Sequence, residues 1–177
     1  MAELRRNRDW FSELCFCILT ANYTAEGGMC IQKAADFSAL DERRIRALLK
    51  RCGHRFPNVR AKYICEAKKH ENALAALKKM RNDAERREWL VKNVKGLGYK
   101  EASHFLRNVG FFDVAIIDRH ILNVLAEYGI IEKPKTLTPK KYLEIEGRLR
   151  KIARRLHMPL GELDFYLWWM KTGKILK

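Results

Sequence analysis

The sequence predicts an all-α protein. Apolar residues recur three and four positions apart along most of the chain, glycine and proline separate these segments, and no segment alternates convincingly as a half-buried strand does. Hydrophobic residues make up 47% of the 177 residues, which is enough for one or two small domains with a proper core.

Each expected helix follows from the local pattern. Residues 10–19 are strongly apolar, residues 58–80 carry apolar side chains at helical spacing, and the segment after Asp118 is apolar on one face and stops at Gly129. Two prolines, Pro134 and Pro139, mark the connection to the next helix. The expected helices span residues 10–19, 26–35, 42–51, 58–80, 82–94, 100–108, 119–128, 142–156 and 160–170.

A glycine turn joins two of these helices. Gly96 and Gly98 flank Leu97, and glycine lets a turn take positive φ and approach a ligand closely. The amides of the turn and of the next helix start would face an anionic DNA backbone or a bridging monovalent cation. An ordinary αα-hairpin turn explains the glycines equally well.

Lys100 lies in the first turn of the helix that follows. The positive end of the helix dipole disfavours a protonated amine there, and only a neutral amine attacks carbon. This position therefore favours a nucleophilic lysine over an ordinary surface lysine.

Asp118 precedes the segment RHILNVLAEYG and is expected to be its N-cap. The helix from Lys100 to Val109 is roughly 14 Å long, and seven extended residues can span about 23 Å back. A Lys100–Asp118 pair in one cleft is therefore permitted, although a plain N-cap accounts for Asp118 as well.

Four segments carry a resemblance to a known family. They are FCILTAN (16–22), KGLGYKEASHFLRNVG (95–110), IIDRHI (116–121) and DFYLWWMKTGKILK (164–177). The chain resembles the helix-hairpin-helix DNA glycosylases, and within them the type 2 8-oxoguanine DNA glycosylase/AP lyases. This resemblance implies two helical subdomains flanking a DNA-binding cleft. The expected subdomains are residues 10–112, with the hairpin at about 85–109, and residues 113–177 together with 1–9.

The resemblance also implies the chemistry of a bifunctional repair enzyme acting on double-stranded DNA that contains 8-oxoguanine. The damaged nucleotide is flipped out of the stack, because its oxidised edge cannot be inspected in the duplex. Asp118 then stabilises charge on the sugar, and Lys100 attacks C1′ to form a Schiff base that undergoes β-elimination 3′ to the abasic site. No metal or redox cofactor is needed for these steps.

Five further residues receive roles by resemblance. Phe56 and Trp168 are expected to sandwich the flipped purine, and the terminal Lys177 to reach the lesion pocket. Asn22 is expected to fill the gap left in the duplex, and His120 to contact a phosphate. The alternatives are core aromatics for Phe56 and Trp168, a solvated basic end for Lys177, a cap for Asn22 and a solvent-facing His120.

The five cysteines all fall within the first 65 residues, without a CxxC pair, and most are expected to be buried thiols. Some relatives in the wider superfamily carry a four-cysteine iron-sulfur loop after the catalytic aspartate. Because no cysteine follows Asp118, no iron-sulfur cluster is expected.

Composition agrees with a nucleic-acid partner. A net charge of +15 and a pI near 9.8 favour a polyanion, although a lysine-rich thermophile protein has a similar balance. No apolar run has transmembrane length and the amino terminus is charged throughout, so we expect an intracellular, soluble monomer without a membrane partner. Two other functions stay open: an endonuclease III-like enzyme for oxidised pyrimidines, and a non-catalytic hairpin that only binds DNA.

Overall fold

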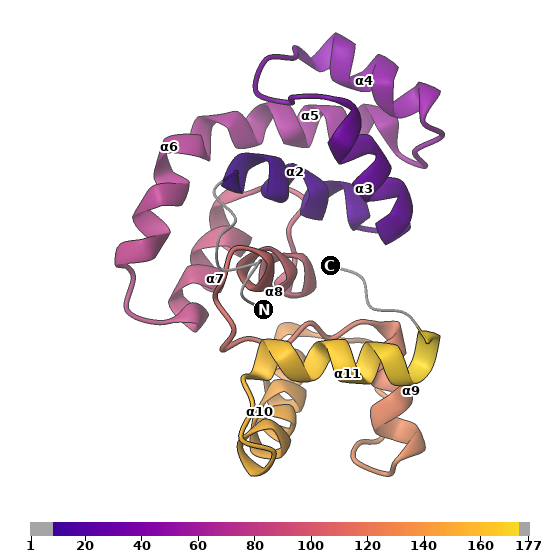
Figure 1. Ribbon diagram of the computed structural model, residues 1–177, viewed down its shortest axis with the longest axis vertical. Helices are drawn as coiled ribbons and strands as arrows, with labels where there is room; N and C mark the ends of the chain where they lie inside the picture. Colours follow the sequence, from indigo (N-terminus) through magenta and orange to yellow (C-terminus); the bar gives the residue numbers. More distant parts are fainter. Residues whose placement is uncertain (1–8, 174–177) are drawn as a thin grey trace.

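The computed structural model describes residues 9–173, which form helices joined by turns, with no strand among them (Figure 1). This confirms the all-α prediction. The helices are α2 (Trp10–Thr20), α3 (Ala25–Ala34), α4 (Glu42–Arg51), α5 (Pro57–Ala67), α6 (Glu71–Leu74), α7 (Asp83–Asn93), α8 (Tyr99–Asn108), α9 (Arg119–Glu127), α10 (Pro139–Arg155) and α11 (Leu160–Thr172). Two short 3₁₀ helices, Lys68–His70 and Ala75–Lys79, flank α6.

Side chains cap most of these helices. The N-cap oxygens of Asp41, Thr138 and Asn82 each accept a backbone amide of the first turn, and proline occupies the first position of α5 and α10. Such caps satisfy amides that have no partner within the helix, which is why these helices begin where they do.

The predicted single helix over residues 58–80 is wrong. The chain leaves α-helical geometry after Ala67 and passes through the two 3₁₀ turns around α6. The tighter turn brings residues three apart onto one side, and Leu74 and Leu77 are both buried. Arg86 of α7 donates to the carbonyls of Leu77, at 2.8 Å, and Met80, at 2.6 Å, which stabilises this irregular end.

The helices enclose two hydrophobic cores. The first draws on α2 to α8 and ends with Val114, and the second begins with Ala115 and draws on α9, α10 and α11. Figure 1 shows the same two groups, with the segment between α8 and α9 running from one to the other. The hydrophobic core changes between residues 114 and 115. The expected subdomain boundary after residue 112 stays a prediction, and residues 1–8 of the second subdomain lie outside the described residues. No helix within residues 9–173 is both long and apolar enough to cross a membrane.

Candidate active site

The hairpin consists of α7, a turn and α8. Gly96 has φ +89°, and a Cβ at this position would lie 2.6 Å from the ring of Tyr63, so the turn requires glycine here. Gly98 is the N-cap of α8 with φ −91°, and its amide donates to the Glu101 carboxylate at 3.2 Å. The expected positive φ therefore occurs at Gly96 and not at Gly98.

Lys100 is the second residue of α8, as its position after the turn predicts. Its Nζ lies 3.3 Å from Oε1 of Glu101, and about a third of its side chain is exposed. The amine therefore reaches the surface of a hollow instead of being enclosed in the core.

Asp118 is the N-cap of α9, which confirms the capping prediction. Its Oδ1 accepts the amides of His120, at 2.8 Å, and Ile121, at 2.9 Å. Both of these cap bonds are accepted by the same oxygen, Oδ1. The half-buried carboxylate is thus fixed by the helix that it starts.

A cavity of about 130 Å³ brings Lys100 and Asp118 together between the two cores. Its walls come from helices α2, α3, α8 and α11, from the turn between α2 and α3, and from the end of the segment before α9. The lining residues are Thr20, Tyr23, Ala25, Lys100, His104, Arg107, Ile116, Asp118, Asp164 and Trp168. The pair that the sequence permitted therefore shares one cavity.

Five polar residues of this cavity were not predicted from the sequence: Thr20, Tyr23, His104, Arg107 and Asp164. His104 and Arg107 follow Lys100 by four and seven residues, and Asp164 precedes Trp168 by four, so helical spacing from a recognised residue was the available signal. Arg107 and Asp164 form a buried ion pair. Burial raises the pKa of Asp164 to about 6 against the effect of Arg107, and the nearby Asp118 carboxylate adds to the rise.

Trp168 and His120 lie in contact beside the cavity. Their rings meet edge to face, with centroids 4.9 Å apart and planes at 77°. Both line a larger, more open hollow of about 880 Å³ that also includes Lys100, Asp118 and Asn22. An aromatic wall therefore adjoins the two reactive groups.

Asn22 follows α2 and adopts a left-handed φ of +62°, which asparagine tolerates better than most residues. Ala21 is the C-cap of α2 and Thr24 is the N-cap of α3, so the capping alternative for Asn22 is wrong. The exposed Asn22 lines the larger hollow and also the hollow beside the hairpin.

Phe56 does not line the cavity of Lys100 and Asp118. It lies with Asn22, Gly96 and Gly98 around a separate hollow of about 520 Å³, and 37% of it is exposed. Phe56 and Trp168 therefore line different hollows, and their expected stacking on a flipped purine stays a prediction. The loop explains the difference, because the Phe56 amide donates to Nδ1 of His54 at 3.1 Å and Pro57 starts α5. Lys177 lies outside the described residues.

The cysteines are all free thiols within the described residues. Cys15 and Cys17 are buried as expected, but Cys52 and Cys65 are half-buried and Cys30 is exposed, so fewer thiols are buried than the sequence predicted. Residues 9–173 contain no group of three His, Cys, Asp or Glu side chains placed to hold a metal ion.

Comparison with known proteins identifies the family. The family model described as 8-oxoguanine DNA glycosylase matches residues 1–158. The chain belongs to this family. It is 53% identical over 176 residues to the 8-oxoguanine DNA glycosylase/AP lyase of Methanocaldococcus jannaschii, covering 98% of this chain and 85% of the relative. A relative of the same name from Korarchaeum cryptofilum is 52% identical over 184 residues, covering 100% and 88%.

Solved structures of the family have the same fold. The M. jannaschii 8-oxoguanine glycosylase/lyase in complex with a 15mer DNA containing 8-oxoguanine matches with a TM-score of 0.94 and 51% identity, covering 99% of this chain and 87% of that one. The 8-oxoguanine DNA glycosylase of Thermotoga maritima matches with a TM-score of 0.92 and 42% identity, covering 99% and 88%.

Proposed function

We propose that this protein excises 8-oxoguanine from double-stranded DNA and then cleaves the strand 3′ to the abasic site. The observation that carries the proposal is the shared cavity of Lys100 and Asp118 in a chain of this family. The relative solved with DNA containing 8-oxoguanine supports the choice of substrate. We further propose that the protein acts as an intracellular monomer.

The two residues divide the chemistry. The Asp118 carboxylate stabilises positive charge on the sugar as the glycosidic bond breaks, because its charge acts in a partly buried site. The neutral amine of Lys100 forms the new bond to C1′, and the electron pair of the broken bond leaves with the base. Glu101, 3.3 Å from Nζ, is placed to take the proton that Lys100 loses.

The covalent intermediate then leads to strand cleavage. A proton transferred to O4′ opens the sugar ring, and the nitrogen lone pair of Lys100 forms an iminium ion with C1′, which acidifies the proton on C2′. When a base or water takes that proton, its electron pair forms the C2′–C3′ double bond and the 3′ oxygen leaves with its phosphate, which completes β-elimination. We propose that no metal or redox cofactor takes part in these steps, and that a monovalent cation, where present, binds only at the hairpin.

The hollows around the pair suggest how DNA is held. Trp168 offers a ring face for the flipped base, and such stacking is worth about 1 to 3 kcal/mol per base. His120 is proposed to contact a phosphate, Asn22 the gap in the duplex, and Gly96 and Gly98 the backbone. By family resemblance, Phe56 and Lys177 complete lesion recognition when DNA is bound.

Borohydride trapping tests the proposal, because reduction fixes the Schiff base as a covalent adduct. The wild type, Lys100→Gln and Lys95→Gln would be tested on duplexes that hold 8-oxoguanine, thymine glycol or guanine at one site. Lys95 is the matched control, since it is an exposed lysine of the same hairpin that pairs with Glu66 outside the cavity.

We expect adducts with 8-oxoguanine for the wild type and Lys95→Gln, and none for Lys100→Gln, which should still bind DNA. Adducts formed mainly with thymine glycol would assign the protein to oxidised pyrimidines. Absence of any wild-type adduct would contradict lyase activity and favour a hairpin that only binds DNA.

A further inference from the structure

The segment between α8 and α9 carries Asp118 at its end, and side chains of neighbouring helices bind its backbone. The amide of Asp113 donates to Asp83 of α7 at 2.8 Å, and that of Ala115 donates to Glu146 of α10 at 3.0 Å. The amide of Ile117 donates to the hydroxyl of Tyr142, also of α10, at 3.2 Å. Every second amide from 113 to 117 is therefore bound by a side chain.

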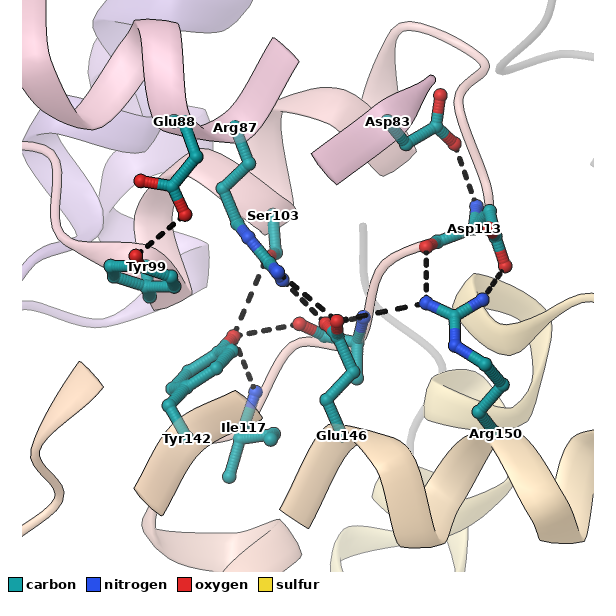
Figure 2. A network of polar contacts seen from close by, with 11 residues as sticks. Asp83, Arg87, Glu88, Tyr99, Ser103, Asp113, Ile117, Tyr142, Glu146 and Arg150 are labelled. Atoms are coloured by element: carbon teal, nitrogen blue, oxygen red, sulfur yellow. Dashed lines mark hydrogen bonds and ion pairs between the residues drawn. The ribbon is translucent and has the colours of Figure 1, made fainter. Parts of the chain in front are cut away.

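Two carbonyls of the segment are bound from the same helix. The Tyr142 hydroxyl donates to the carbonyl of Ala115 at 2.7 Å, and Arg150 donates to that of Asp113 at 2.9 Å. Figure 2 shows Tyr142, Glu146 and Arg150 side by side along α10, each directed at the segment. These backbone amides and carbonyls of the segment are thus hydrogen-bonded to side chains, and not to a neighbouring strand as in a sheet.

The spacing of these contacts follows from helix and strand geometry. Tyr142, Glu146 and Arg150 are four residues apart, which corresponds to about 6 Å per step along a helix. Residues 117 and 115 are two apart, which corresponds to about 6.6 Å in an extended chain, and the segment bends at residues 113 and 114. The step from Tyr142 to Glu146 therefore nearly matches the step from residue 117 to residue 115. Arg150 binds the bend, so one face of α10 binds the segment at three points.

A buried arginine connects this arrangement to the hairpin. Arg87 of α7 is fully buried and forms an ion pair with Glu146, with a second bond of 3.0 Å from Nη2 to Oε1. The same guanidinium donates to Ser103 of α8 at 3.3 Å, and the Tyr142 hydroxyl lies 3.4 Å from that serine oxygen. Ser103 is one helical turn after Lys100, so a continuous polar network joins the helix of Lys100 to the segment of Asp118 (Figure 2).

We propose that Arg87, Tyr142 and Glu146 are positioning residues that set the placement of Asp118 relative to Lys100. This inference rests on the proposed function, because it assigns the network to excision by that pair. None of the three lines the cavity, so none touches the reacting atoms. The network acts through the backbone of residues 113–117, whose last member adjoins Asp118.

Tyr142 is the most informative residue for a test. It is 2% exposed, and burial raises the pKa of its phenol, so the hydroxyl keeps its proton and continues to donate to Ala115 at working pH. Tyr142→Phe removes only that hydroxyl and keeps the ring in the second core. Ile145→Val is the matched control, because it removes a buried methyl group from the same helix and leaves every bond to the segment intact.

Two single-turnover rates would be compared at a temperature where all variants are folded: excision of 8-oxoguanine, and strand cleavage at a preformed abasic site. A preformed abasic site has already lost its base. Strand cleavage there therefore requires Lys100 but not the charge stabilisation by Asp118. We expect Tyr142→Phe to slow excision on the order of 10-fold to 100-fold, because small displacements of reacting groups are costly, and to change cleavage less than about threefold. Ile145→Val should leave both rates near those of the wild type.

Equal losses of both rates in Tyr142→Phe, or a loss of excision no larger than in Ile145→Val, would overturn the positioning role. Such a result differs from failure of the proposed function, in which the wild type itself would not excise 8-oxoguanine. Amide hydrogen exchange gives a measurement independent of activity. Tyr142→Phe should speed exchange at Ile117 and Ile145→Val should not, whereas unchanged exchange in Tyr142→Phe would contradict the proposal.

Discussion

In the proposed mechanism, Asp118 has two tasks. Its Oδ1 accepts the first amides of α9, and the residue lines the same cavity as Lys100. Because the cap holds the carboxylate in place before DNA arrives, its charge is positioned in advance for the positive charge that the proposed mechanism develops on the sugar. Capping and catalysis are therefore not competing explanations for this residue.

Asp118→Asn separates the two tasks. Asparagine caps a helix about as well as aspartate, so the free energy of unfolding should change by less than about 0.5 kcal/mol. Loss of the charge should slow excision on the order of 100-fold or more. Single-turnover kinetics and denaturant unfolding measure the two effects. Asp118→Ala is the companion variant and should lose about 1 kcal/mol of stability as well; a wild-type excision rate in Asp118→Asn would leave Asp118 as a cap alone.

His54 provides a pH-dependent contact near the hairpin. It is 4% exposed, its Nε2 lies 3.0 Å from the carbonyl of Leu19, and its Nδ1 accepts the amide of Phe56. Only the neutral ring with its proton on Nε2 satisfies both partners. Burial is the main reason that the pKa of His54 is lowered.

Stability should therefore fall in acid. Since the folded pKa of His54 lies below the unfolded value of about 6.5, its contribution is complete above about pH 6.5 and is lost as pH falls through the lowered folded pKa. Between about pH 7.5 and about pH 5, the free energy of unfolding measured with denaturant should decline less for His54→Asn than for the wild type. His157→Asn is the control at an exposed histidine and should keep the wild-type slope; equal slopes for all three proteins would refute the role of His54.

At the scale of elements, the sequence predicted regular helices better than their interruptions. Residues 42–51 were predicted with the bounds of α4, and α8 began within one residue of its predicted start, because caps and apolar spacing are local signals. The break after Ala67 was missed because its cause is not local. The break depends on Lys68, which donates to the carbonyls of Ser38 and Leu40. It also depends on Arg86, which donates to the carbonyls of Leu77 and Met80.

The hairpin turn makes an element-scale prediction. Gly96→Ala must accommodate a Cβ at positive φ and 2.6 Å from the Tyr63 ring, so it should cost more than about 1 kcal/mol of unfolding free energy. Gly98→Ala is the matched substitution two residues on. Its φ suits alanine and its Cβ would meet only the flexible end of Glu101 at 3.2 Å, so its cost should be smaller. Thermal and denaturant unfolding measure both losses. An equal loss of unfolding free energy in Gly96→Ala and Gly98→Ala would contradict this account of the turn.

At the scale of the whole molecule, the site lies where the two cores meet. Lys100 belongs to the hairpin beside the first core, whereas Asp118 and Trp168 accompany helices of the second. The sequence permitted this pair, because each residue lies in a distinctive local motif and the chain between them is long enough to bring them together. It could not reveal the Arg87–Glu146 and Arg107–Asp164 pairs, which join residues 59 and 57 positions apart. Nothing local marks one carboxylate among many as the partner of a given arginine.

We expect two separate contributions to DNA binding. One comes from the net charge of +15 acting on phosphates, and the other from contacts to the flipped base in the small cavity. Lysine and arginine contacts to phosphates release counterions and depend steeply on salt, but they are the same for damaged and undamaged duplexes.

In the proposed function the flipped base lies in the cavity, so its contacts should add affinity with little salt dependence. The Kd of Lys100→Gln, which we expect to bind without turnover, would be measured between about 50 and 200 mM salt for both duplexes. The two plots of log Kd against log salt should be parallel and separated by a constant offset that favours 8-oxoguanine. A steeper slope for the damaged duplex would show instead that lesion recognition recruits additional phosphate contacts, and that charge and cavity do not act independently.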